Sequence, residues 1–324
     1  MQTNRRQLLC LASAFLMPTL QPAFAQVAYP SKPVKFIVPF GAGGGSDSTA
    51  RFIAQKLNEK HGYTVIVDNR PGAGGNLGAE AALREPADGY TFLVISGSYV
   101  LNALLNKPNF DPIGAITPVV QFTREAMMLG VGASTPYKTL REFVADAKQR
   151  PDKVSFGSAG AGSLSHVAAE HFNALAGLKI VHVPYKGTAQ SLTDLAAGEI
   201  QMVTSGSSSF GALAKAGKIR PLAVAAPARL PSYPAVPTFA EQGFPTYRAD
   251  LWHGLVAAKG TPPEIVAKMN ADINAVLSLP ETQKRFASDD VSPAGGTPLQ
   301  FGEVIKQDME RWREVILKAD IKIN

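Results

Sequence analysis

Residues Val38–Asp47 read VPFGAGGGSD, in which a β-branched segment runs directly into a turn that contains four glycines. Glycine adopts positive φ angles and lets another backbone or a ligand approach closely. Ser46 and Asp47 are residue types that begin helices. The stretch therefore predicts a strand, a tight turn and a helix N-terminus, where unpaired amides attract an anion. One such loop alone more often makes only a tight turn.

The same order of strand, Gly/Ser loop and helix recurs four more times along the chain. The further loops are Asn69–Ala79 (NRPGAGGNLGA), Ile95–Tyr99 (ISGSY), Phe156–His166 (FGSAGAGSLSH) and Thr204–Gly211 (TSGSSSFG). In doubly wound α/β sheets, ligands bind outside the carboxyl ends of the strands, where such loops lie. We therefore expect the five loops to form one binding site, or the facing halves of one.

Short β-branched runs alternate with helical patterns along most of the chain. The predicted strands are residues 34–40, 64–68, 91–96, 117–122, 127–132, 154–157, 180–183, 200–204, 222–226 and 251–257. The predicted helices include residues 46–60, 140–149 and 299–318, and helix starts are also marked by capping boxes at Thr139, Thr238 and Thr261. This order predicts an open, mostly parallel sheet with helices on both faces.

The first 25 residues have the features of a cleavable export signal. Arg5 and Arg6 precede an apolar stretch, residues 8–20, which is too short to span a bilayer, and residues 23–25 (AFA) resemble a cleavage site. We expect this segment to be removed and the protein to reach the periplasm by the Sec route rather than the twin-arginine route. Cys10 is the only cysteine, so the sequence predicts a mature protein without disulfides or thiolate ligands.

The charge composition argues against nucleic acid as a partner, and the length of the apolar segments argues against a membrane span. Lys and Arg number 32 against 26 Asp and Glu, a formal net charge of +6, and no long basic run occurs. Nucleic-acid binding requires a concentrated basic face, so we expect no nucleic-acid partner. No segment after the export signal approaches the length of a membrane span, which predicts a soluble mature protein.

The glycine loops do not match the motifs of nucleotide-binding or hydrolytic sites. They lack the lysine of a phosphate loop and the third glycine of a dinucleotide fingerprint. The nearest match to the hydrolase elbow G-x-S-x-G has Phe210 in place of the second glycine. His166 and Glu170 could share a helix face, but a metal site would lack a third ligand. We therefore expect no catalytic residue, metal or cofactor, and the alternative is an exported hydrolase that uses Ser163 or Ser208.

Five motifs, in order along the chain, together carry a family resemblance. They are PFGAGGGSD, NRPGAGGNLGA, SAGAGSLSH, VPYKG and DLAAGEIQM. The chain resembles the extracytoplasmic solute receptors of tripartite tricarboxylate transporters, the TctC-like or Bug family. The resemblance implies an α/β periplasmic binding protein of the type II fold, with two doubly wound lobes joined by crossover segments around a ligand cleft. We place lobe 1 over residues 26–124 and 225–324 and lobe 2 over residues 125–224.

The resemblance also implies a set of ligand-binding residues, because the family grips a carboxylate through amides, hydroxyls and water. In lobe 1 they are Phe40, Gly41, Gly44, Gly45, Asp47, Ser96 and Ser98. In lobe 2 they are Ser158, Gly160, Gly162, Ser163, His166, Tyr185, Lys186 and Gly187. Asp47 could instead cap a helix, and Tyr185 and Lys186 could shape their loop without touching the ligand.

The function implied by the resemblance is transport. A monomeric periplasmic receptor would capture a small carboxylate, which could be an organic acid, a dicarboxylate or an aromatic or amino-acid carboxylate. It would then deliver this solute to integral-membrane transporter subunits. A ligand-sensing receptor that presents its closed form to a signalling partner is a further interpretation, which the sequence does not separate from transport.

Overall fold

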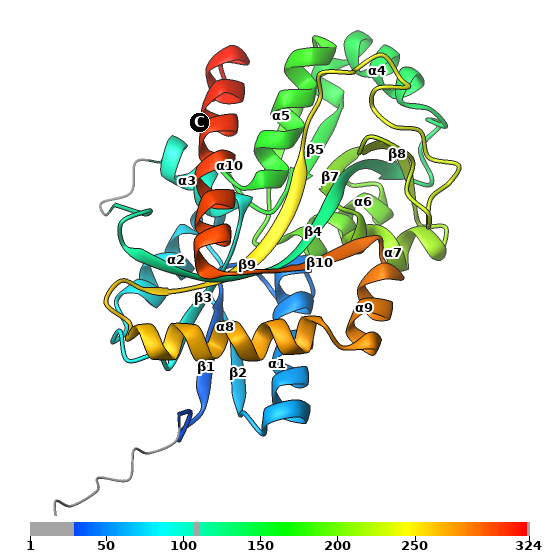
Figure 1. The fold of residues 1–324 in the computed structure, drawn as a ribbon. Helices are drawn as coiled ribbons and strands as arrows, with labels where there is room; N and C mark the ends of the chain where they lie inside the picture. Colours follow the sequence, from blue (N-terminus) through cyan, green and yellow to red (C-terminus); the bar gives the residue numbers. More distant parts are fainter. Residues whose placement is uncertain (1–28, 107–110, 323–324) are drawn as a thin grey trace, which may run out of the picture. The chain divides into compact units, whose positions relative to one another are not determined.

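The computed structural model describes residues 29–106 and 111–322 (Figure 1). The predicted export signal, residues 1–25, lies outside these residues. The fold and the site belong to the compact unit Lys32–Asn324. Within the described residues, no helix combines the length and the apolar character that a membrane crossing requires.

Two groups of three parallel strands lie at the two ends of the sheet. The strands of the first group are β1 (Val34–Val38), β2 (Val65–Asn69) and β3 (Thr91–Ser96). The strands of the second group are β5 (Ser155–Ser158), β6 (Val181–Pro184) and β7 (Met202–Gly206). Each group has its first strand in the middle, so β1 lies between β2 and β3, and β5 lies between β6 and β7.

Antiparallel strands join these groups in the middle of the sheet. They are β4 (Ile116–Gly132), β8 (Ile219–Ala225), β9 (Asp250–Ala258) and β10 (Val291–Gly295). β4 pairs antiparallel with β7, β8, β9 and β10, and β9 pairs antiparallel with β3. The prediction of a mostly parallel sheet therefore holds for the two end groups and is wrong for the centre. The local alternation of strands and helices does not predict whether neighbouring strands run parallel or antiparallel.

β4 is one continuous strand where the sequence predicts two. The predicted strands 117–122 and 127–132 are joined through residues 123–126, which pair with β9. The register shifts between Gln121 and Thr123, as at a β-bulge, and the strand continues beyond it. β4 pairs with β9 as far as Ala126 and with β7 from Met127 onward, so it passes from one parallel group to the other.

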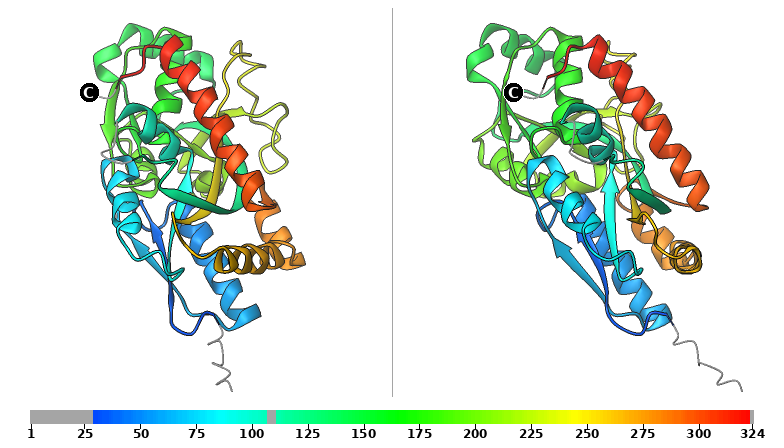
Figure 2. Two further views of the ribbon diagram at one scale, coloured as in Figure 1. Left: turned by 60° about the vertical axis from the view of Figure 1, so that its left-hand side comes forward. Right: turned by 90° about the vertical axis from the view of Figure 1, so that its left-hand side faces the viewer.

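Helices follow the strands of both groups (Figures 1 and 2). They are α1 (Gly45–His61), α2 (Asn76–Leu83), α3 (Gly97–Leu105), α4 (Leu140–Gln149), α5 (Leu164–Ala176), α6 (Thr188–Ala197), α7 (Ser207–Lys215), α8 (Pro263–Leu277), α9 (Pro280–Ala287) and α10 (Pro298–Lys318), with the 3-10 turns η1 (Ala73–Gly75) and η2 (Pro151–Lys153). All five predicted strand-loop-helix units are confirmed, because β1, β2, β3, β5 and β7 lead into α1, α2, α3, α5 and α7. The long helix α10 packs on β4, α3 and α5 (Figure 2).

The capping boxes show where a local signal is sufficient and where it is not. Thr139 and Glu142 bond reciprocally and begin α4, as predicted. Thr238 and Glu241 make the same two hydrogen bonds, at 2.6 and 3.1 Å, yet no helix follows. Gly243, two residues after Glu241, has a φ of 91°, which turns the chain away from the helical conformation. A capping box therefore does not start a helix when glycine interrupts its first turn.

The helix predicted after Thr261 is present, but its cap differs. The Thr261 hydroxyl donates to the Ala258 carbonyl at 2.8 Å, and α8 begins after Pro262 instead. A box that was not predicted, Thr297 with Gln300, begins α10. For this segment the sequence predicts the helix correctly but not the residue that caps it.

The apolar core lies on the faces of the sheet under these helices. One cluster contains Trp252 and Phe301, whose rings meet edge to face with centroids 5.5 Å apart. A second, larger cluster lies around Phe172 and Phe239. Burying each such side chain contributes about 1.5–3 kcal/mol. These cores fix the strand ends from which the glycine loops project.

Candidate functional site

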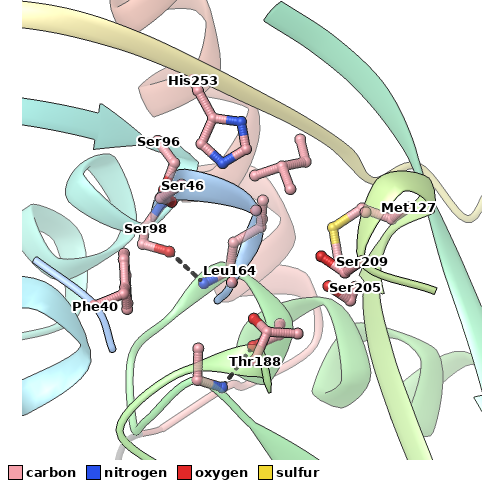
Figure 3. A pocket seen from close by; sticks show the side chains of 16 residues that line it. Phe40, Ser46, Ser96, Ser98, Met127, Leu164, Thr188, Ser205, Ser209 and His253 are labelled. Carbon is pink, nitrogen blue, oxygen red and sulfur yellow. Dashed lines mark hydrogen bonds between the residues drawn. The ribbon is translucent and has the colours of Figure 1, made fainter. Parts of the chain in front are cut away.

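The N-termini of five helices meet at one cavity (Figure 3). Loops or first turns of α1, α3, α5, α6 and α7 all contribute, because each helix follows a strand of a parallel group. The cavity offers about 40 Å³ to the centres of water-sized molecules. The lining residues are Phe40, Gly44, Gly45, Ser46, Ser96, Ser98, Met127, Ala159, Leu164, Ser165, Thr188, Ser205, Gly206, Ser209, Leu251 and His253.

The lining combines hydroxyls, backbone and apolar side chains, and it contains no lysine, arginine or carboxylate. Figure 3 shows Phe40 and Ser98 on one side of the cavity and Met127, Ser205 and Ser209 on the other. Peptide dipoles and hydroxyl donors therefore have to hold any anion that binds here, without an opposite side-chain charge.

The first turns of α1 and α6 begin with glycine and have no side-chain cap. Gly44 is the N-cap of α1, and Gly187 is the N-cap of α6. The two turns face each other, since a methyl group built on Gly44 would lie 4.0 Å from the Thr188 amide nitrogen. First-turn amides need a partner when no N-cap side chain supplies one. We call Gly44–Ser46 and Thr188 the α1–α6 cradle, and its peptide donors are suited to an anion.

Serine caps satisfy the first turns of α3 and α5 from within the protein. Ser96 Oγ accepts from the Ser98 amide, and Ser163 Oγ accepts from the His166 amide, each at 3.4 Å. The Leu164 amide donates to Ser98 Oγ at 2.9 Å, which ties the two helix ends together (Figure 3). These amides already have partners, so they are less available to a ligand than those of the α1–α6 cradle.

Loops from the two parallel groups touch beside the cavity. The Gly41 amide donates to the Lys186 carbonyl at 2.9 Å. A methyl group on Gly187 would lie 3.1 Å from the Gly41 nitrogen. A methyl group on Gly74 would lie 2.2 Å from the Ala161 carbonyl oxygen, so only glycine permits this approach. These backbone contacts bring the two groups together around the cavity.

Asp47 holds the first glycine loop rather than lining the cavity. Its carboxylate accepts from the Gly43 amide at 2.9 Å, from Arg51 Nε at 3.0 Å and from Asn69 Nδ2 at 2.9 Å. Burial alone would raise the pKa of this carboxyl, but its hydrogen bonds, led by that from Arg51, hold the pKa below its usual range. Asp47 is not the N-cap of α1, which is Gly44.

Two stacked histidines support the loop in front of α5. The rings of His166 and His182 are 3.9 Å apart between centroids. His166 Nδ1 accepts from the Gly162 amide at 3.2 Å, and His182 Nε2 lies 2.7 Å from Ser158 Oγ. Burial lowers the pKa of His166 to about 4, and burial together with the neighbouring imidazole lowers the pKa of His182 to about 3. Both rings are neutral near pH 7 and act as framework.

The far wall of the cavity comes from the central strands. Met127 lies on β4, and Leu251 and His253 lie on β9. His253 Nδ1 is 3.3 Å from Thr123 Oγ1, and burial lowers the pKa of His253 to about 4. The sequence analysis missed these residues because nothing local distinguishes them from other buried strand positions.

The structure divides the predicted ligand-binding residues into two sets. Those that line the cavity are Phe40, Gly44, Gly45, Ser96 and Ser98. Those that lie outside the lining are Gly41, Asp47, Ser158, Gly160, Gly162, Ser163, His166, Tyr185, Lys186 and Gly187. Lining residues of the same loops that were not predicted are Ser46, Ala159, Leu164, Ser165, Thr188, Ser205, Gly206 and Ser209. The Gly/Ser signal locates a loop but not the residue that faces the cavity.

The two serines of the hydrolase alternative have no imidazole base in this structure. Ser163 Oγ lies 3.1 Å from Ser165 Oγ and caps α5. Ser208 Oγ donates to Glu125 Oε1 at 3.1 Å. Neither hydroxyl is hydrogen-bonded to an imidazole, which is the base of a serine triad, and the Glu125 carboxylate also accepts from the Ser208 amide at the N-terminus of α7.

Comparison with known proteins gives a consistent match over nearly the whole chain. A family model described as "Tripartite tricarboxylate transporter family receptor" matches residues 49–321. BugT of Bordetella pertussis is 32% identical over 298 residues, which cover 91% of each chain.

Two solved structures with bound carboxylates share the fold. An R. palustris protein solved with adipate has a TM-score of 0.87 and 35% identity, over 91% of this chain and 99% of that one. MatC from Rhodopseudomonas palustris, solved with bound malate, has a TM-score of 0.85 and 28% identity, over 89% of this chain and 100% of that one.

Proposed function

This chain belongs to the tripartite tricarboxylate transporter receptor family, and we propose that it captures a small carboxylate in the periplasm for uptake by a membrane transporter. Members of the family are solute-binding receptors rather than enzymes. The adipate and malate in the two related structures support a carboxylate as the class of ligand. The features of an export signal in residues 1–25 support the periplasmic location.

The α1–α6 cradle is the observation that carries this proposal. It brings two uncapped helix N-termini to one cavity wall that has no cation. A hydrogen bond to a charged group contributes about 1.5–3 kcal/mol, and micromolar affinity requires about 8 kcal/mol. About four oriented donors would therefore supply the free energy that micromolar affinity requires and offset part of the free-energy cost of association. We propose that the ligand carboxylate binds between Gly44–Ser46 and Thr188.

Calorimetric titration tests whether the negative charge of the ligand is what the cavity recognises. The protein is first unfolded and refolded to remove any ligand that copurifies, and that ligand is identified by mass spectrometry. We expect at least one acid in a panel of aliphatic and aromatic carboxylates to bind with a micromolar Kd. Its neutral amide should bind at least about 100-fold more weakly, because charge-assisted hydrogen bonds are lost. Equal binding of acid and amide, or a flat response to the whole panel, would contradict the proposal.

We further propose that two lobes close on this carboxylate. The division into residues 26–124 with 225–324 and residues 125–224 is supported by β4, which changes partners between Ala126 and Met127. Closure would add donors from α6 to those of α1, so the ligand favours the closed form. Small-angle scattering should show a smaller radius of gyration with ligand than without it. An unchanged radius would contradict closure without contradicting binding.

Delivery to integral-membrane transporter subunits follows from the family and is the final part of the proposal. We expect a monomer by size-exclusion chromatography. Affinity capture from membranes, with and without ligand, should recover transporter subunits preferentially with the liganded protein. Recovery of a signalling receptor instead would favour the sensing alternative.

A further inference from the structure

Glu125 is a buried carboxylate that lies against the cavity without lining it. The residue is 4% exposed and precedes Met127 by two positions on β4, so both side chains point to the same side of the sheet. Met127 lines the cavity (Figure 3). Gly206, another lining residue, packs on the carboxylate, since a methyl group there would lie 2.6 Å from Glu125 Cδ and Oε2. Only one glycine residue separates Glu125 from the cavity.

Glu125 occupies the N-terminus of α7 as an anionic ligand would. Its Oε2 accepts from the Ser208 amide at 2.8 Å and from Ser207 Oγ at 3.2 Å. Its Oε1 accepts from Ser208 Oγ at 3.1 Å. The N-cap of α7 is Gly206, which has no capping side chain, as in α1 and α6. In α7 a protein carboxylate accepts from a first-turn amide, whereas Asp47 in the first turn of α1 accepts from the Gly43 amide, which precedes that helix.

The surroundings of Glu125 make this wall unfavourable to a second anion. Burial raises the pKa of the Glu125 carboxyl, and the hydrogen bonds from Ser207 and Ser208 act in the opposite direction by favouring its charged form. Asp289, which is itself paired with Arg285, acts on Glu125 as a like charge. The lining beside Glu125 is formed by Met127, Leu251 and hydroxyls such as that of Ser209, which carry no positive charge. Like charges at short range repel more strongly in a buried site than in water. A ligand carboxylate at this wall would meet an occupied helix terminus and a neighbouring carboxylate.

We propose that Glu125 is a specificity-determining residue that restricts this cavity to monocarboxylates whose far end is uncharged. The inference rests on the proposed function, because it assumes that one carboxylate already binds in the α1–α6 cradle. The family relatives solved with adipate and malate hold dicarboxylates, so the expected preference differs from those ligands.

Matched pairs of ligands test this selectivity. Butyrate against succinate and hexanoate against adipate differ only in the second carboxylate, and calorimetry gives the affinity ratio within each pair. We expect the wild-type protein to bind the monocarboxylate about tenfold more tightly or better. In Glu125→Gln, which keeps the shape and an acceptor oxygen, we expect that ratio to fall about fivefold, mainly through stronger binding of the dicarboxylate.

Asp272→Asn is the control for loss of a buried carboxylate outside the cavity. Asp272 lies on α8 and accepts from the Tyr63 hydroxyl, and its substitution should leave both ratios unchanged. An equal change for both members of a pair in Glu125→Gln would indicate a structural role and overturn the proposal. A wild-type preference for dicarboxylates would overturn it without any variant. If no carboxylate binds the wild-type protein, it is the proposed function that fails.

Discussion

The first turns of α1 and α3 reach the same cavity but are satisfied by different partners. The N-cap of α3 is Ser96, whose hydroxyl accepts from the amide of Ser98, whereas the N-cap of α1 is Gly44, which supplies no side-chain cap. A serine cap completes the helix end within the protein, and a glycine cap leaves that role to another group. The same strand-loop-helix unit therefore has a side-chain partner for its first-turn amides in α3 and no N-cap side chain to supply one in α1.

The largest expected effect comes from closing the glycine-started end. In Gly44→Val, the side chain would enter the space between α1 and Thr188, where a methyl group meets its nearest atoms only at 3.8 and 4.0 Å. The φ of −80° at Gly44 suits valine, so the fold should persist. Blocking two or three charge-assisted hydrogen bonds should weaken carboxylate binding about 1,000-fold, as measured by calorimetry.

Gly302→Val on α10 provides the matched control, because Gly302 is outside the cavity lining and a methyl group there is only in ordinary contact with Pro118. It should bind ligand like the wild-type protein. If Gly44→Val binds the carboxylate as tightly as the wild-type protein, the glycine-capped end of α1 is not a binding group.

Lowering the pH tests the serine-capped helix α5, because the neutral imidazole of His166 supports the loop in front of this helix. The pKa of His166 is lowered by burial to about 4, below the value of about 6.5 in an unfolded chain. Between these pH values the unfolded state binds a proton that the native state does not, so the free energy of unfolding falls as the pH is lowered. His166 alone should account for about 3 kcal/mol over this range.

Urea unfolding at several pH values between 7.5 and 4 measures this loss. His166→Gln keeps an acceptor for the Gly162 amide and cannot be protonated, so its stability should depend less steeply on pH. Parallel pH profiles of the variant and the wild-type protein would show that this ring does not control the acid sensitivity.

The smallest effect is expected from removing a serine cap. Ser163 is fully buried, caps α5 and lies outside the cavity lining. Ser163→Ala should lower the free energy of unfolding by about 1 kcal/mol, the usual cost of losing an N-cap. Carboxylate affinity should change less than about twofold, because the hydroxyl is committed to the protein. A much larger loss of affinity, with stability intact, would place Ser163 in the binding site.

The sequence allowed the loops to be predicted but not their orientation toward the cavity. Glycine and serine after a β-branched run act locally, so Gly44 and Ser96 could be identified as parts of a site. The side chain of Asp47 turns back to the loop because Arg51 and Asn69 hold it, and Asn69 comes from another strand. Such a contact between distant residues has no local signature.

The central strands were the least predictable part of both the fold and the site. The continuity of β4 depends on its pairing with β9, which is more than 120 residues away in the chain. His253 reaches the cavity through that pairing, and Met127 lies where β4 changes its partner from β9 to β7. Both residues are buried within strands like ordinary core residues, so only the assembled sheet distinguishes them.

Because peptide groups build the α1–α6 cradle, its chemistry is largely independent of which side chains occupy Ser46 and Thr188. Substitutions that alter Met127, Leu251 or Ser209 would reshape the opposite wall while the anchoring groups stay in place. If the proposed carboxylate binding is correct, a few substitutions in that wall would change which solutes fit while the peptide donors for the acid group stay the same.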